Sequence, residues 1–120
     1  MKIAITTNGD GLDARVDPRF GRAPRFLVYF LETGAFTLKE NTQNLHAAQG
    51  AGIQSAMHLC GEEVDCVITG HCGPKAFATL DAAGIKVYTC ADTTVGEAIR
   101  RLKNGKLAPA SEANVEGHWV

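Results

Sequence analysis

Short apolar runs recur at five places along the chain, and each is bounded by residues typical of turns. The runs are rich in β-branched and aromatic residues, which favours strands. They predict strands at Lys2–Thr7, Arg25–Glu32, Ala35–Asn41, Asp65–Thr69 and Ile85–Tyr88. Only Thr33 and Gly34 separate the second run from the third, so these two predict a hairpin. Val67 and Ile68 end a run with no polar alternation, which indicates a strand buried on both faces.

Three other segments carry apolar residues at three- and four-residue spacing, the pattern of an amphipathic helix. They predict helices from Gly50 to about Gly61, from Pro74 to Ala83, and from Thr94 to Gly105. Thr94 and Glu97 have the spacing of a capping box, and Gly84 fits the end of the second helix. The side chains expected to face the core are Ile53, Ala56, Met57 and Cys60; Ala76, Phe77, Leu80 and Ala83; Val95, Ala98, Ile99 and Leu102.

This β-β-β-α-β-α-β-α order predicts an α/β fold with one five-stranded mixed sheet. Right-handed crossovers place the first, fourth and fifth strands side by side, and the hairpin extends one edge. The segment Thr42–Gln49 is polar and is expected to be a loop. We expect residues 1–107 to form a single domain and residues 108–120, which show no period, to form a C-terminal tail.

In open sheets of this kind, ligands bind beyond the carboxyl ends of the strands. Three segments leave the sheet at that edge: the residues after Asn8, those from Gly70 to Pro74, and those after Cys90. The first is a long segment, Asn8–Pro24, punctuated by glycine, proline and aspartate, with Val16, Phe20 and Ala23 as apolar anchors. Loops of that length in a small domain are usually functional or disordered, and the anchors favour a functional one.

Four arginines, Arg15, Arg19, Arg22 and Arg25, fall within residues 15–25, which we call the arginine loop. Guanidinium groups suit an anionic ligand. The alternative is a solvated loop in which the arginines pair with nearby aspartates at 10, 13 and 17. Those aspartates also raise the possibility of a two-metal nuclease, but they crowd into one loop and do not converge from several elements, which disfavours it.

Residues 70–75, Gly-His-Cys-Gly-Pro-Lys, form the second candidate segment, which we call the glycine turn. Gly70 and Gly73 permit close backbone approaches, and Pro74 fits the first position of a helix. The backbone N–H groups and the positive end of the helix favour an anion there. His71 and Cys72 are potential metal ligands. Equally, Cys72 could be a small buried apolar residue, and His71 could only hydrogen-bond at the start of the helix.

Composition restricts the function further. The chain has 120 residues, 45% of them hydrophobic, and a formal charge of −1, so nothing global points to nucleic acid or a membrane surface as a partner. No apolar run is long enough to span a bilayer, and the N-terminus reads as a strand, so we expect a cytoplasmic protein with thiols in place of disulfides. Cys60 and Cys66 are expected in the core, and Cys90 stays open as an outer contact of the ligand edge.

With these segments placed, the chain resembles the dinitrogenase iron–molybdenum cofactor biosynthesis family over almost its whole length, from Lys2 to about Leu107. This family includes carriers of the nitrogenase cofactor and the orange protein of sulfate reducers. Four motifs carry the resemblance, in order: Asp-Pro-Arg-Phe-Gly-Arg-Ala at 17–23, Gly-Ala-Gly-Ile-Gln at 50–54, Val-Ile-Thr-Gly with Gly-Pro-Lys-Ala-Phe at 67–77, and Ala-Gly-Ile-Lys-Val-Tyr at 83–88.

The resemblance implies a ribonuclease H-like three-layer fold and a carrier or scaffold that binds a metal–sulfur cluster of molybdenum with iron or copper, not an enzyme. Cluster donor and acceptor proteins would be its partners. Together with the residue patterns, it predicts a binding site formed by Asn8, Arg15, Arg19, Phe20, Gly21, Arg22, Ala23, Gly70, Gly73, Pro74 and Lys75, with His71 and Cys72 as metal ligands. The alternatives are a nucleotide- or phosphate-binding module, although the glycine turn lacks P-loop spacing, and a protein-interaction domain.

Overall fold

The computed structural model describes residues 1–41, 51–90 and 92–110. Each predicted strand and helix is present there, and no end differs from its predicted position by more than two residues. The predicted loop Thr42–Gln49 lies outside the described residues. The elements are, in chain order, β1 (Lys2–Thr7), β2 (Arg25–Phe30), β3 (Phe36–Glu40), α2 (Ala51–Gly61), β4 (Cys66–Thr69), α3 (Pro74–Ala82), β5 (Lys86–Thr89) and α4 (Val95–Lys103).

The five strands form one mixed sheet in the order β3-β2-β1-β4-β5. β1 pairs with β4, and β4 with β5, in parallel, whereas β2 is antiparallel to both β1 and β3. The three parallel strands therefore lie side by side and the hairpin extends the sheet beyond β1, as the crossover argument predicts. The α/β class and the five-stranded mixed sheet are confirmed, whereas the ribonuclease H-like assignment stays a prediction.

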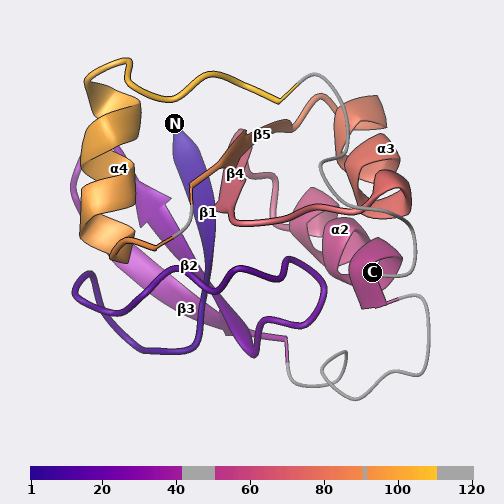
Figure 1. Ribbon diagram of the computed structural model, residues 1–120, viewed down its shortest axis with the longest axis horizontal. Coiled ribbons are helices and arrows are strands. Elements are labelled where there is room, and N and C mark those ends of the chain that lie inside the picture. Colours follow the sequence, from indigo (N-terminus) through magenta and orange to yellow (C-terminus); the bar gives the residue numbers. More distant parts are fainter. Residues whose placement is uncertain (42–50, 91, 111–120) are drawn as a thin grey trace.

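Helices cover both faces of the sheet (Figure 1). Along β1, Ile3 and Ile5 point to the face covered by α4, and Ala4 points to the face covered by α2 and α3. This alternation follows from the two-residue period of a strand. Two buried clusters result, one on each face, and the parallel strands are apolar on both sides as their sequence indicates.

The inward face of α2 differs from the predicted one. Met57, expected inside, is 62% exposed, and Ile53 and Cys60 are only partly buried. The buried face carries Ala56, as predicted, together with Ala51, Gly52, Ser55 and Leu59. Small and polar side chains face inward because this part of the helix packs closely on the arginine loop, where a large apolar residue would not fit. The spacing of apolar residues therefore predicted the helix correctly but did not predict correctly which of its faces is buried.

The helix ends follow the sequence signals closely. The backbone N–H of Glu97 donates to Thr94 Oγ1 over 3.2 Å, as the capping spacing predicts. Gly84 and Gly105 adopt φ values of +78° and +69°, which only glycine adopts readily. Ala83, by contrast, is exposed and not inward as expected, because α3 ends at Ala82.

The chain beyond α4 returns to the edge of the sheet. Pro109 forms a bridge with Tyr88, and the Ala110 N–H donates to the Val87 carbonyl over 2.7 Å. The first residues of the predicted tail thus pair with β5, and the division at residue 107 stays a prediction. None of the helices within the described ranges is long and apolar enough to cross a bilayer.

Candidate functional site

The long segment between β1 and β2 is tied to the body of the domain by its backbone. The Val16 N–H donates to the Thr93 carbonyl over 3.0 Å, and the Asp17 N–H donates to the Thr6 carbonyl over 2.8 Å. Phe20 and Ala23 are no more than 1% exposed, and Val16 is 5% exposed. All three predicted anchors are therefore in the core, and they fix the segment against the domain so that it has a defined outer surface.

The arginine loop and the glycine turn lie side by side, as their shared sheet edge predicts. Arg19 and His71 form a parallel bridge, in which the Phe20 N–H donates to the His71 carbonyl over 3.2 Å. Gly70 is also pressed against Pro18: a Cβ at position 70 would lie 2.6 Å from the Pro18 Cα and 2.9 Å from its carbonyl oxygen. Gly70 is thus required for contact between the two segments.

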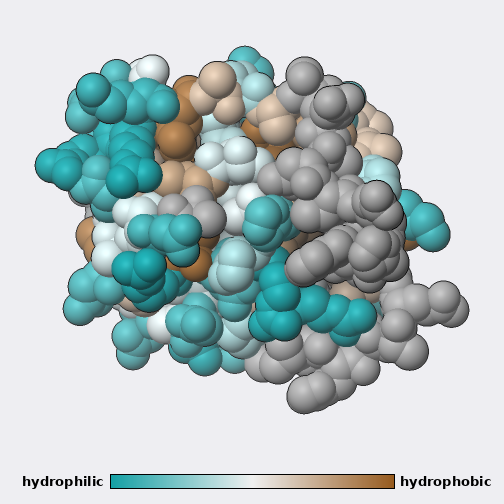
Figure 2. All heavy atoms as spheres, in the orientation of Figure 1, coloured by the Kyte–Doolittle hydropathy of each residue, from teal (hydrophilic) through white to brown (hydrophobic). Residues whose placement is uncertain are grey.

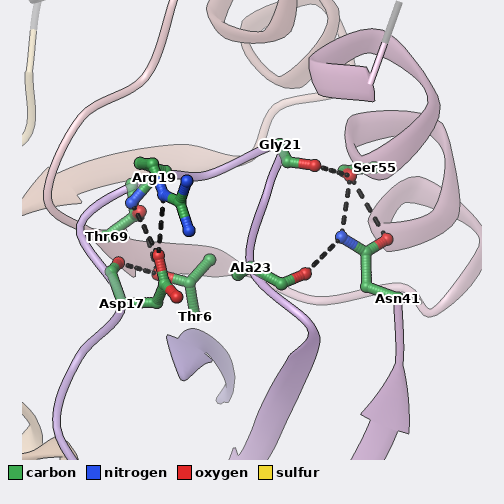
Figure 3. A network of polar contacts seen from close by, with 8 residues as sticks. All are labelled: Thr6, Asp17, Arg19, Gly21, Ala23, Asn41, Ser55 and Thr69. Atoms are coloured by element: carbon green, nitrogen blue, oxygen red, sulfur yellow. Dashed lines mark hydrogen bonds and ion pairs between the residues drawn. The ribbon is translucent and has the colours of Figure 1, made fainter. Parts of the chain in front are cut away.

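A buried polar cluster fixes the base of the arginine loop (Figure 3). The Thr6 hydroxyl donates to the Asp17 carbonyl over 2.7 Å and lies 2.9 Å from the Thr69 hydroxyl. The Asp17 carboxylate is 3% exposed and accepts the Arg19 N–H over 2.9 Å, while the Arg19 Nε is 3.9 Å away. Asp17 therefore orders the backbone at Arg19 and makes only a long ion pair with its side chain.

Pairing of the arginines with loop aspartates is accordingly limited. Within the described ranges, the ion pair between an arginine of the loop and a loop aspartate is that of Arg19 with Asp17. The Arg19 side chain is still 53% exposed. Arg25 pairs instead with Glu40 at 3.4 Å and donates to the Gly9 carbonyl over 3.2 Å. Arg25 thus belongs to the β2–β3 hairpin, and the positive surface of the loop comes from its earlier arginines.

Asn41 is a structural residue that no pattern in the sequence singles out. It is fully buried; its N–H donates to the Pro24 carbonyl over 2.7 Å, and its Nδ2 donates to the Ala23 carbonyl over 2.8 Å. Nδ2 also donates to Ser55 Oγ on α2 over 3.1 Å (Figure 3). One amide therefore joins the hairpin, the arginine loop and α2.

Gly21 completes this junction by its lack of a side chain. A Cβ there would lie 2.7 Å from the Gly52 nitrogen and 2.8 Å from its Cα. The sequence did contain a signal for this contact, because Gly21 and Gly52 stand in two of the four family motifs. Their role is a close approach of loop and helix backbones, so Gly21 holds the arginine loop against α2.

The structure divides the predicted site residues into an outer and an inner set. The outer residues, whose side chains are exposed or half-buried, are Asn8, Arg15, Arg19, Arg22, His71, Pro74 and Lys75. The inner residues, which are buried, are Phe20, Gly21, Ala23, Gly70, Cys72 and Gly73. Phe20 and Ala23, predicted both as anchors of the loop and as part of the binding site, are buried and anchor the loop.

Cys72 is placed as a core residue. It is 1% exposed within the cluster that includes Phe20 and Ala76, and burial raises the pKa of its thiol to about 12. A metal ligand must be a thiolate, so ligation by Cys72 would require loss of this proton and a turn toward the surface. The structure therefore favours the alternative of a small buried apolar residue.

The other cysteines are also structural in character. Cys66 is buried in β4, where burial raises the pKa of its thiol to about 11, and Cys60 packs against the same core as Cys72. Cys90 is 7% exposed and accepts a hydrogen bond from the Arg101 guanidinium over 3.4 Å. Across the described residues, no group of three or more His, Cys, Asp or Glu side chains converges to hold a metal ion.

Comparisons with known proteins agree with this architecture. Residues 1–105 match the family described as dinitrogenase iron-molybdenum cofactor. The apo form of the orange protein from Desulfovibrio gigas is 41% identical, with a TM-score of 0.93 over 95% of this chain and 96% of that one. A putative NifB protein from Thermotoga is 36% identical, with a TM-score of 0.83 over 97% and 98%.

A further relative is an uncharacterized protein of Methanocaldococcus jannaschii, 32% identical over 109 residues, which are 89% of each chain. The family match spans the β1–β2 loop and the β4–α3 turn together, so both halves of the candidate site fall inside the matched region. The chain belongs to the dinitrogenase iron-molybdenum cofactor family.

Proposed function

We propose that this protein is a non-catalytic carrier or scaffold for an anionic metal–sulfur cluster that contains molybdenum with iron or copper. The observation that carries the proposal is the backbone bridge between Arg19 and His71, which brings two exposed cationic segments to one sheet edge. Arg15, Arg19 and Lys75 are all exposed on these segments. Membership of the family supports the same class of cargo.

The hydrogen-bond donors at this edge suit a cluster that is bound through its sulfide atoms. Cluster sulfides carry negative charge, and guanidinium and backbone N–H groups donate to such anions without a covalent bond to the metal. His71, whose side chain is exposed, is the candidate for a direct bond to a metal. Because the described residues offer no multi-thiolate set, the cluster would be bound by several weak contacts, which suits a protein that must release it to an acceptor.

A phosphate or nucleotide ligand is the alternative that one observation favours. The glycine turn leads into α3 with Gly73 as N-cap and Pro74 in the first turn, so the positive end of a helix lies at the same edge. That geometry attracts oxyanions as well as sulfides. The carrier proposal includes proteins that donate the cluster and accept it, whereas a phosphate- or nucleotide-binding module would need no such partners.

The test is anaerobic purification followed by a visible absorption spectrum and metal analysis. The metal-free protein is then mixed with tetrathiomolybdate, alone and with a copper or iron salt, and separated from unbound metal by gel filtration. Charge-transfer bands with retained molybdenum support the carrier. A colourless protein that retains no molybdenum but binds a nucleotide in equilibrium dialysis contradicts it and favours the alternative.

A further inference from the structure

A second surface feature lies away from the arginine loop and the glycine turn. It is a pocket of about 210 Å³ between α4 and the tip of the β1–β2 loop, lined by Leu12, Tyr29, Gly96, Ile99, Arg100 and Lys103. None of these residues belongs to the candidate cluster site. The pocket lies on the face of the sheet that α4 covers, since Tyr29 and Ile99 belong to the buried cluster of that face.

The size of the pocket indicates what could occupy it. Sites for small molecules and cofactors usually measure about 300–1,000 Å³, so this pocket is small for a metabolite. Its floor is apolar, with Leu12 37% exposed beside the nearly buried Tyr29 and Ile99. An apolar pocket of this size is suited to one large side chain of a partner, the usual form of an interface anchor.

The charge around the pocket indicates what should surround that side chain. Between residues 95 and 106 there are four cations, at 100, 101, 103 and 106, and one carboxylate, Glu97. Glu97 pairs with Arg100 and with Arg101, and the Arg100 side chain is still 69% exposed. The Lys103 ammonium lies 5.5 Å from the Tyr29 ring centroid, and both residues line the pocket. Figure 2 shows hydrophilic residues gathered over α4.

The wall of the pocket lies close to the start of the arginine loop. The Gly96 N–H donates to the Leu12 carbonyl and the Val95 N–H donates to the Ala14 carbonyl, each over 2.8 Å. Arg15 then forms a bridge with Thr94. A partner seated against Leu12 would therefore touch the same stretch of backbone that carries Arg15, three residues further on.

We propose that this pocket, formed by Leu12, Tyr29 and Ile99 under the cations of α4, is a docking site for an acidic segment of a partner protein that inserts one aromatic or branched apolar side chain. The apolar floor takes the anchor, and Arg100 and Lys103 pair with flanking carboxylates. Electrostatic attraction of this kind mainly sets partner choice and association rate, while the anchor sets the dissociation rate. Neither contact uses a residue of the candidate cluster site.

The experiment uses the full chain and a fluorescein-labelled peptide with one phenylalanine between runs of aspartate and glutamate. Binding is followed by fluorescence polarisation. Replacing the phenylalanine with alanine, or the acidic residues with lysine, is expected to weaken binding about fivefold or more. In the protein, Leu12→Ala and Lys103→Glu are each expected to have an effect of at least that size.

Two matched variants control for general effects. Met57→Ala removes an exposed apolar side chain from α2, on the other face of the sheet, and Lys106→Glu reverses a charge next to α4 that does not line the pocket. Both should bind within about twofold of the unchanged protein if the pocket is specific. The proposal is overturned if Lys106→Glu weakens binding as much as Lys103→Glu, if the alanine peptide binds equally well, or if no acidic peptide binds.

Discussion

The arginine loop and the glycine turn meet at one edge but are built in different ways. The arginine loop is held by buried side chains, notably Val16, Asp17 and Phe20, and shows its charges outward between them. The glycine turn is held by contact between backbones, because Gly70 lies against Pro18 with no room for a Cβ. In the loop, the groups proposed to bind and the groups that stabilise are different residues. In the turn, the backbone stabilises and is also proposed to bind.

This difference implies that the two halves will respond differently to substitution. Changes at exposed arginines should leave stability intact and alter only ligand binding, because surface charges contribute little to folding. Changes at the close contacts should alter stability first, because two segments must then separate. The variants below compare the two halves on that basis, from the largest expected loss of stability to the smallest.

Gly70→Ala tests the turn most severely. The added Cβ would lie 2.6 Å and 2.9 Å from backbone atoms of Pro18, which cannot rotate away, so the loop must be displaced. We expect the free energy of unfolding, measured with urea, to fall by about 2–3 kcal/mol. Gly61→Ala is the matched control, since nothing lies within 4 Å of a Cβ there. Equal effects at both positions would show that the contact with Pro18 is not what holds the turn.

Asn41→Ala tests the junction behind the arginine loop. Removal of the buried amide leaves the Ala23 carbonyl and the Ser55 hydroxyl without this partner, and we expect a loss of about 1–3 kcal/mol. A double-mutant cycle with Ser55→Ala should show a coupling energy of about 0.5 kcal/mol or more. Strict additivity of the two substitutions would mean that the bond between Asn41 and Ser55 does not join α2 to the loop.

The pH dependence of stability tests whether Cys72 is a buried core residue or an accessible metal ligand. The folded-state pKa of about 12 lies above the usual thiol value of 9.0, so the unfolded chain releases this proton first as the pH rises. The stability contributed by Cys72 is therefore complete below about pH 9 and is lost between about pH 9 and pH 12.

At pH 10 the unchanged protein should have lost about 1 kcal/mol more, relative to pH 8, than Cys72→Ala. The measurement is urea unfolding of both proteins at the two pH values. Alkylation by iodoacetamide at pH 8 is the companion test, and Cys72 should react more slowly than the partly exposed Cys60. Fast alkylation of Cys72, with the same pH dependence of stability in the unchanged protein and in Cys72→Ala, would mean that the thiol is accessible and is again a candidate metal ligand.

Much of the fold could be predicted because its signals are local and repeat within each element. The strand runs, the Thr94 cap and the glycine stop at Gly84 are all of this kind. The face of α2 was mispredicted because a contact far away in sequence decides it: Ser55 and Gly52 face inward to meet Asn41 and Gly21. No periodicity within the helix contains that information.

The candidate site was predictable to the same extent. That the arginine loop and the glycine turn meet follows from strand topology, which the sequence order determines. Which of their side chains point outward does not follow, because burial of Cys72 and Phe20 depends on the core they share. The pocket beside α4 was not predicted either, since its wall joins Leu12 to residues more than eighty positions later in the chain.

The most direct test of the account is molybdenum retention by Arg19→Ala/Arg22→Ala beside a control, Arg100→Ala/Lys106→Ala, that removes two positive charges near α4. Each protein is loaded anaerobically with tetrathiomolybdate and a copper salt, gel-filtered, and assayed for bound molybdenum and for melting temperature. We predict that the loop variant loses most of its molybdenum while its melting temperature stays within about 2 °C, and that the control keeps both. Unchanged retention in the loop variant, or an equal loss in the control, would contradict the proposed site.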